Sequence, residues 1–113
     1  MVDATTTVMA LRERVRLFVD ARDWNQFQTP KDLAIAISVE ASELLERFLW
    51  RAGNTASLSP EDSAATSEEL ADVMIYCLGL ANAMHLDLSE AMVAKLAKDE
   101  AKYPADQFRG RAR

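Results

Sequence analysis

Four acidic residues stand in two pairs of equal spacing near the middle of this 113-residue chain. They are Glu40 and Glu43, followed by Glu69 and Asp72. Residues three apart on a helix lie on one face, one turn from each other. At about 100° per residue, both pairs fall within or beside the apolar stripe of their segment. The sequence therefore predicts these carboxylates where two helices pack together.

Carboxylates at a packing face need a partner, because a buried and unpaired carboxylate is costly and four of them repel one another. A hard divalent cation such as Mg²⁺ or Mn²⁺ coordinates carboxylate oxygens and removes both problems. Two facing helices that each offer acids at i and i+3 could hold one or more such ions. Some of the acids could instead be solvated or paired with Arg47 or Lys31. Glu69 also fits a capping box with Thr66, which is a purely structural role.

The elements that position these acids are expected to be helices. The chain is 50% hydrophobic with three Gly and three Pro, and Ala, Leu, Glu and Lys dominate its long segments. Periodicity and capping signals predict four helices over residues 8–21, 30–51, 67–84 and 88–102. Thr29 and Pro30 begin the second, Gly53 would stop it, and a short helical turn could begin at Pro60. Residues 22–29 read as a loop, and the N-terminus and the arginine-bearing C-terminal tail read as mobile.

The predicted fold is therefore an all-α, antiparallel four-helix bundle, with residues 1–113 as one domain and a core over about 8–104. The helices predicted over 30–51 and 67–84 are apolar around nearly their whole circumference. A lone bundle of this size cannot easily cover that surface. A homo-oligomer, either a dimer or a tetramer, is expected to bury the excess.

Composition narrows the classes of partner and compartment. The formal net charge of −5 argues against nucleic-acid binding. The chain has neither an apolar run of membrane length nor a signal-peptide pattern, which favours a cytoplasmic protein with no membrane partner. Cys77 is the only cysteine, so no intrachain disulfide can form, and its position among apolar residues is typical of buried filler.

A carboxylate-bridged di-iron bundle is the main metal-site rival. That site needs a Glu-x-x-His pair on two helices. The single histidine, His85, stands at a predicted helix end, where a surface or capping role is expected. Oxygen-only ligation favours Mg²⁺ or Mn²⁺, which usually accompany phosphates. A basic stripe suits the same substrate, although such a stripe is also typical of a solvated face; it comprises Lys95, Lys98 and Lys102.

Three aromatic residues flank the acidic segments. Trp24 precedes the second predicted helix, Trp50 stands at its end, and Tyr76 shares the face of Glu69 and Asp72. Such residues often anchor a core or an interface. Beside a metal–phosphate site they could instead stack on a nucleobase.

Four motifs in this order resemble the MazG-like nucleotide pyrophosphohydrolases, and among them the small dCTP pyrophosphatase branch. They are RDWNQF, SVEASELLERFLW, EELADVMIYCLGLA and KLAKDEAKYP. The resemblance covers about residues 11–104. It implies an all-α enzyme, usually a dimer or tetramer, that hydrolyses a (deoxy)nucleoside triphosphate to monophosphate and pyrophosphate with Mg²⁺, Mn²⁺ being possible. The expected substrate is dCTP or a modified deoxynucleotide.

The resemblance also implies roles for individual residues. The metal ligands would be Glu40, Glu43, Glu69 and Asp72. Glu40 and Glu43 would also be catalytic, with Glu43 orienting the attacking water or taking its proton. Aromatic contacts to the base would come from Trp24, Trp50 and Tyr76. The phosphate end would be contacted by Lys95, Lys98, Lys102 and Tyr103.

Two positions depart from the pattern of this branch. Gln28 stands where the dCTP branch tends to carry His, which leaves the base preference open. Asp99 stands where the family often has Asn, so it is expected to contact either metal or a neighbouring lysine. The alternative function from another class is a non-catalytic helical oligomer that serves as an interaction or nucleotide-binding module. Stabilisation by Mg²⁺ and nucleotide would separate an enzyme from such a scaffold.

Overall fold

A computed structural model describes residues 1–51 and 58–111 of the chain, all of its regular structure being helical. The elements are α1 (Val8–Ala21), a 3₁₀ turn η1 (Asn25–Phe27), α2 (Pro30–Glu46), α3 (Pro60–Met84), α4 (Leu88–Lys102) and α5 (Ala105–Phe108). The predicted all-α class with four main helices is confirmed. No helix in the described ranges is long and apolar enough to cross a membrane.

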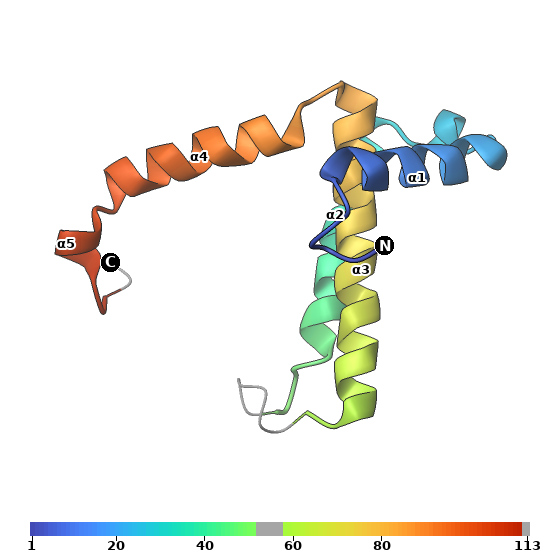
Figure 1. Ribbon diagram of the computed structural model, residues 1–113. Coiled ribbons are helices and arrows are strands. Elements are labelled where there is room, and N and C mark those ends of the chain that lie inside the picture. Colours follow the sequence, from blue (N-terminus) through green and yellow to red (C-terminus); the bar gives the residue numbers. More distant parts are fainter. Residues whose placement is uncertain (52–57, 112–113) are drawn as a thin grey trace.

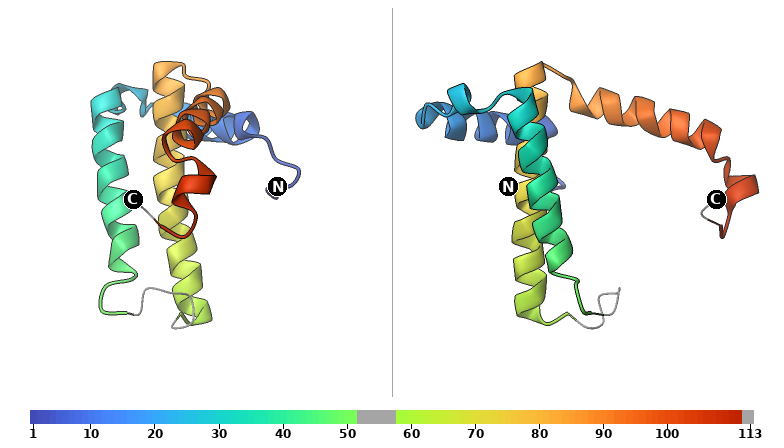
Figure 2. Two further views of the ribbon diagram at one scale, coloured as in Figure 1. Left: turned by 90° about the vertical axis from the view of Figure 1, so that its left-hand side faces the viewer. Right: turned by 180° about the vertical axis from the view of Figure 1, so that it is seen from behind.

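The helices α2 and α3 lie side by side and antiparallel, and α1 crosses α3 (Figures 1 and 2). From the end of α3, the chain turns and α4 leads away from the other three helices (Figure 1). No residue of α4 is buried. The fourth helix of the predicted bundle is therefore present, but it does not pack against the first three within one chain.

The small core lies where α1, α2 and α3 meet. Its buried apolar residues are Val19, Leu33, Leu78 and Ala81. A polar contact ties α1 to α3, because Arg12 Nε donates to Asn82 Oδ1 at 2.9 Å and Asn82 Nδ2 donates to the Arg12 carbonyl at 3.1 Å. The core and this contact hold α1 across α3.

Leu33 is the most deeply buried of these side chains, at 2% exposure. We expect Leu33→Ala to lower the free energy of unfolding by about 2–5 kcal/mol, because it removes apolar contacts and leaves a cavity. Urea unfolding followed by circular dichroism measures the loss. The control is Ser38→Ala at an exposed position of the same helix, which should change stability by less than about 0.5 kcal/mol. Equal effects of the two substitutions would contradict the packing described.

The predicted ends of α1 and α4 are confirmed, whereas the predicted end of the second helix is wrong. Helix α2 stops at Glu46 and not at Arg51. The Phe48 N–H donates a hydrogen bond to the Leu45 carbonyl, three residues earlier, at 2.9 Å. This shorter spacing tightens the chain into a turn. Trp50 then adopts a left-handed backbone with φ of 65°, which a right-handed helix cannot contain. The predicted stop at Gly53 lies outside the described residues.

Helix α3 begins at Pro60, seven residues before the predicted start at Ser67. Ser59 caps it, and Asp62 completes the capping box by accepting the Ser59 N–H at 3.1 Å. The predicted capping box of Thr66 and Glu69 is therefore wrong, because both residues lie inside α3. The short turn expected at Pro60 is the true beginning of the long helix.

Two shorter elements also differ from expectation. The segment predicted as a plain loop over 22–29 contains η1, and the tail predicted to be mobile contains α5. Tyr103 and Phe108 meet edge to face at 5.2 Å between ring centroids, which folds α5 back on the end of α4. Arg113 lies outside the described residues.

The single chain is extended for its length. Its radius of gyration is 17.0 Å, whereas a compact domain of this length would have about 13 Å. Its accessible surface is 8872 Å². A compact monomer of 12.6 kDa would expose about 6,200 Å². The excess includes large apolar side chains on α4, namely Met92, Val93 and Leu96, which are each more than half exposed.

Candidate active site

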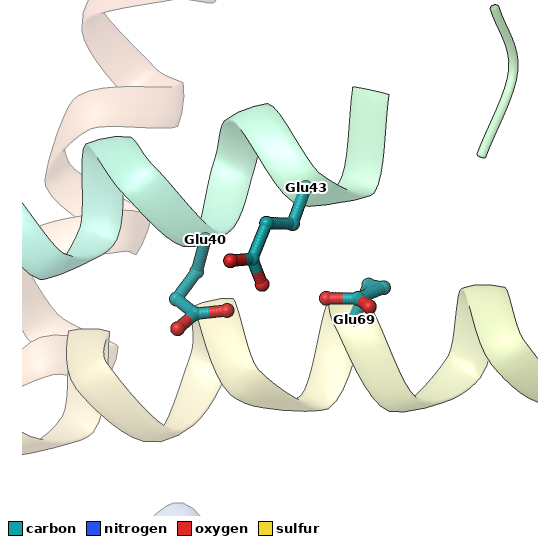
Figure 3. Close-up of side chains that lie close together, drawn as sticks. All are labelled: Glu40, Glu43 and Glu69. Carbon is teal, nitrogen blue, oxygen red and sulfur yellow. The ribbon is translucent and has the colours of Figure 1, made fainter. Parts of the chain in front are cut away.

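Three carboxylates meet between α2 and α3. Glu40 and Glu43 come from successive turns of α2, and Glu69 faces them from α3 (Figure 3). Each residue offers one oxygen, and these three oxygens lie within 4.8 Å of one another. The i, i+3 spacing and the antiparallel packing of the helices together produce the cluster that the sequence predicted.

The cluster is electrostatically unfavourable as it stands. Glu40 Oε2 and Glu69 Oε2 are buried, with no hydrogen-bond partner in the described part of the chain. A hydrogen bond and the charge of Glu40 raise the pKa of Glu43 above its ordinary value. Burial, followed by the charge of Glu43, raises the pKa of Glu69. Protons or a cation are therefore needed to stabilise these three side chains together.

Pairing with basic residues does not neutralise the cluster. The positive charge of Arg47 lowers the pKa of Glu69, but this effect is smaller than those that raise it. Arg47 itself lies 3.7 Å from Asp62, and its Nε is buried without a hydrogen-bond partner in the described ranges. Lys31 forms no ion pair with the described residues. The paired-acid alternative thus fails for this cluster.

The donor set fits a hard divalent cation. All of its atoms are carboxylate oxygens, which Mg²⁺ and Mn²⁺ prefer, and two buried oxygens have free lone pairs for coordination. In the described part of the chain, no histidine joins the group. This arrangement differs from the histidine-containing set of a di-iron bundle.

Asp72, the fourth predicted ligand, lies outside this three-residue cluster. It is exposed on α3, one turn after Glu69, and its charge contributes to the raised pKa of Glu69. Its ligand role remains a prediction. Glu46 occupies a comparable position on α2, where it is exposed and its charge contributes to the raised pKa of Glu43.

A pocket of about 330 Å³ opens beside the N-terminal half of α2. It is lined by Trp24, Phe27, Gln28, Asp32, Leu33, Ala36 and Tyr76. Trp24 is held edge to face against Phe18, with 5.7 Å between the ring centroids. The structure therefore brings two of the three predicted base-contacting aromatics, Trp24 and Tyr76, into one pocket.

The pocket and the acidic cluster both involve α2 and α3, and they are one to two helical turns apart along these helices. On α2, Ala36 in the pocket wall stands one turn before Glu40. On α3, Tyr76 stands two turns after Glu69, or about 10 Å along the axis. A nucleotide with its base in the pocket could thus extend its phosphates toward the carboxylates.

Trp50, the third predicted aromatic, does not line this pocket. It follows the opposite end of α2 and is fully exposed. The prediction that both tryptophans surround one base is therefore not met within a single chain.

The predicted phosphate-binding side chains are also distant from the cluster within one chain. Lys95, Lys98, Lys102 and Tyr103 belong to α4 and its C-terminal cap, which lead away from α2 and α3 (Figure 1). Lys95 Nζ lies 2.6 Å from Asp99 Oδ1. Of the two contacts expected for Asp99, the structure shows the one with a neighbouring lysine.

The sequence interpretation missed Phe27 and Asp32 as residues near the site, whereas it named Arg47 as a possible partner of the acids. Phe27 and Asp32 line the pocket, and Arg47 lies beside Glu69. The positions of Phe27 and Asp32 in the sequence could have indicated that they lie near the site. Phe27 and Asp32 stand on either side of the capped start of α2, and Arg47 follows Glu43 by four residues on the same helical face.

Three comparisons with known proteins bear on this geometry. The profile of the MazG-like family matches residues 35–113, which include all three clustered carboxylates. The dCTP pyrophosphatase 1 of Mus musculus is 38% identical to this chain over 98 residues, and that of Homo sapiens is 37% identical over 99 residues. These alignments cover 84% and 85% of this chain, and the chain spans 58% of the length of either relative.

A solved structure agrees with the fold. The chain superimposes on a pyrophosphatase from Archaeoglobus fulgidus with a TM-score of 0.73 and 34% sequence identity. The match covers 92% of this chain and 99% of the archaeal one. With the profile match and the facing carboxylates of α2 and α3, this likeness leads to one conclusion: the chain belongs to the MazG-like family.

Proposed function

We propose that the protein is a divalent-metal-dependent pyrophosphohydrolase that converts a (deoxy)nucleoside triphosphate, dCTP or a modified relative, to its monophosphate and pyrophosphate. The observation that carries the proposal is the cluster of Glu40, Glu43 and Glu69, with two buried oxygens that have no described partner. The adjoining aromatic pocket supplies a place for a base. The similarity to dCTP pyrophosphatase 1 supports dCTP as the first substrate to test.

Mg²⁺, with Mn²⁺ as a substitute, would be held by Glu40, Glu43 and Glu69, and Asp72 would approach from the next turn of α3. Bound there, the cation would supply positive charge to offset the triphosphate and to make a nearby water more acidic. Glu43, whose pKa is raised by the neighbouring Glu40, is the proton acceptor that we assign to this step. It takes the proton of the attacking water. Trp24 and Tyr76 hold the base by stacking.

The reaction breaks the bond between the α-phosphorus and the oxygen that bridges to the β-phosphorus. Water oxygen bonds to the α-phosphorus, and the bridging oxygen leaves with pyrophosphate. One product is thus the monophosphate, and the water proton passes to Glu43 and then to solvent. The chain contributes mainly orientation and charge placement to this step.

The proposed active unit is a homo-oligomer in which residues 1–113 form one domain, with its core at about 8–104. The extended single chain and the exposed apolar face of α4 support an assembly. Packed against another copy, α4 would bring Lys95, Lys98, Lys102 and Tyr103 to the phosphate end of a site that lacks them within its own chain. In the same assembly, the exposed Trp50 would pack against the surface of another copy.

The test is product analysis on a panel of canonical and modified nucleoside triphosphates, with Mg²⁺ and with EDTA. The proposal predicts monophosphate and pyrophosphate in equal amounts, formed only with the metal. Monophosphate accompanied by two orthophosphates would contradict the site of cleavage. A folded oligomer that turns over no triphosphate, yet is stabilised by nucleotide, would identify a nucleotide-binding module instead.

A further inference from the structure

The pocket beside α2 contains two polar side chains in addition to its aromatic ones, Gln28 and Asp32. Gln28 is half-buried and reaches α3 where Gly79 has no side chain, since a Cβ built there would lie 3.9 Å from Gln28 Oε1. Asp32 lies in the first turn of α2. Stacking on Trp24 and Tyr76 cannot distinguish bases, because every base has an aromatic face. Discrimination must come from side chains that meet the base edge.

Asp32 is held in a defined orientation. The Thr29 hydroxyl donates to Asp32 Oδ2 at 2.9 Å, and the Asp32 N–H donates to Thr29 Oγ1 at 3.2 Å. Asp32 Oδ1 makes no hydrogen bond with the described part of the chain. The first turn of a helix also favours a negative charge. The pocket therefore contains a carboxylate whose second oxygen is available to accept a hydrogen bond from a ligand.

The Gln28 amide complements this acceptor. Its NH₂ group donates and its carbonyl accepts, so it can donate to a ring nitrogen. An acceptor and a donor in one pocket match a base that carries an exocyclic amino group beside an unprotonated ring nitrogen, as cytosine does. A keto base of the same size turns an oxygen toward Asp32, and two acceptors that face each other repel.

We propose that Asp32 is a specificity-determining residue that selects triphosphates whose base carries an exocyclic amino group, with Gln28 donating to the adjacent ring nitrogen. The proposal rests on the proposed function, because it concerns the substrate of that same site. It assigns base choice to the acceptor in the first turn of α2 and not to the aromatic residues.

The test compares kcat/KM for dCTP and dUTP, which differ at this edge by an amino and a keto group. The wild-type protein should favour dCTP. The variant Asp32→Asn should lower the dCTP-to-dUTP ratio about tenfold or more, since an amide can also donate to a keto oxygen. The matched control is Glu90→Gln, an acid-to-amide change in the first turn of α4, which should leave the ratio unchanged.

A measurement on the wild-type protein keeps the test independent of how well the variant folds. Two methyl groups on the exocyclic nitrogen of dCTP remove both donors and retain the ring nitrogen. This analogue should be hydrolysed about tenfold less efficiently than dCTP, mainly through a higher KM. Equal use of dCTP, dUTP and the analogue would overturn the role of Asp32 while leaving the hydrolase intact. Absence of all triphosphate hydrolysis would overturn the proposed function and this inference together.

Discussion

The variant Glu40→Gln is expected to lower Mg²⁺-dependent triphosphate hydrolysis by about 10²–10³-fold, because it removes one charged ligand from the site where the phosphate charge must be offset. The same change should raise the melting temperature in EDTA. Glu40 raises the pKa of Glu43, so these side chains repel one another when both are ionised. Steady-state pyrophosphate release and thermal melting with and without Mg²⁺ measure the two effects.

The control for Glu40→Gln is Glu68→Gln, which changes an exposed acid next to Glu69 in the sequence but outside the cluster. It should retain the wild-type rate and gain no stability in EDTA. Opposite changes in activity and metal-free stability are characteristic of a ligand residue, whereas loss of a purely structural acid would lower both. An active Glu40→Gln protein would contradict the metal site.

The second large effect is expected on α4. Changing Met92 and Leu96 together to Glu should dissociate the proposed homo-oligomer into monomers, because both side chains are 57% exposed and belong to a helix with no buried residue in its own chain. Hydrolysis should fall by about a hundredfold or more, since the lysines of α4 would no longer be held at the phosphates. Light scattering after gel filtration gives the mass, and kinetics gives the rate.

The control places the same new residue on α4 away from Met92, Leu96 and the lysines. Ala97→Glu should leave both mass and activity nearly unchanged, because Ala97 lies about 100° from Leu96 and about 140° from Met92 around the helix, and no lysine stands one turn from it. A Met92 and Leu96 double variant that stays oligomeric would show that α4 does not form the interface. A fully active monomer would show that the site needs no second copy.

The local signals that the sequence carries were sufficient for much of the secondary structure. Thr29 with Pro30 predicted the start of α2, and Asp87 predicted the start of α4. Both are caps whose hydrogen bonds reach only three residues along the chain, so they do not depend on tertiary packing. It was also predictable that Glu40 and Glu43 would face Glu69. Their spacing relative to the apolar residues places these acids on the helix faces where α2 and α3 pack against each other.

The ends of α2 and α3 were harder to predict because local signals competed. Both Ser59 with Asp62 and Thr66 with Glu69 have the spacing of a capping box. A contact between distant residues favours the first, since Arg51 donates two hydrogen bonds to Asp62 at 2.6 and 2.9 Å. Tertiary structure thereby selected the earlier start and lengthened α3 by two turns.

The sequence by itself determined the helical class, the two acid pairs and the oxygen-only donor set, since these depend on residue type and helical spacing. Only the tertiary structure decided which residues share a site. The antiparallel register of α2 and α3 brings Tyr76 to Trp24 and Asp32, whereas the turn after α2 leaves Trp50 exposed. The direction of α4 separates its lysines from the acids of the same chain (Figure 2). Register and helix direction arise from contacts between residues far apart in sequence, which helical periodicity does not encode.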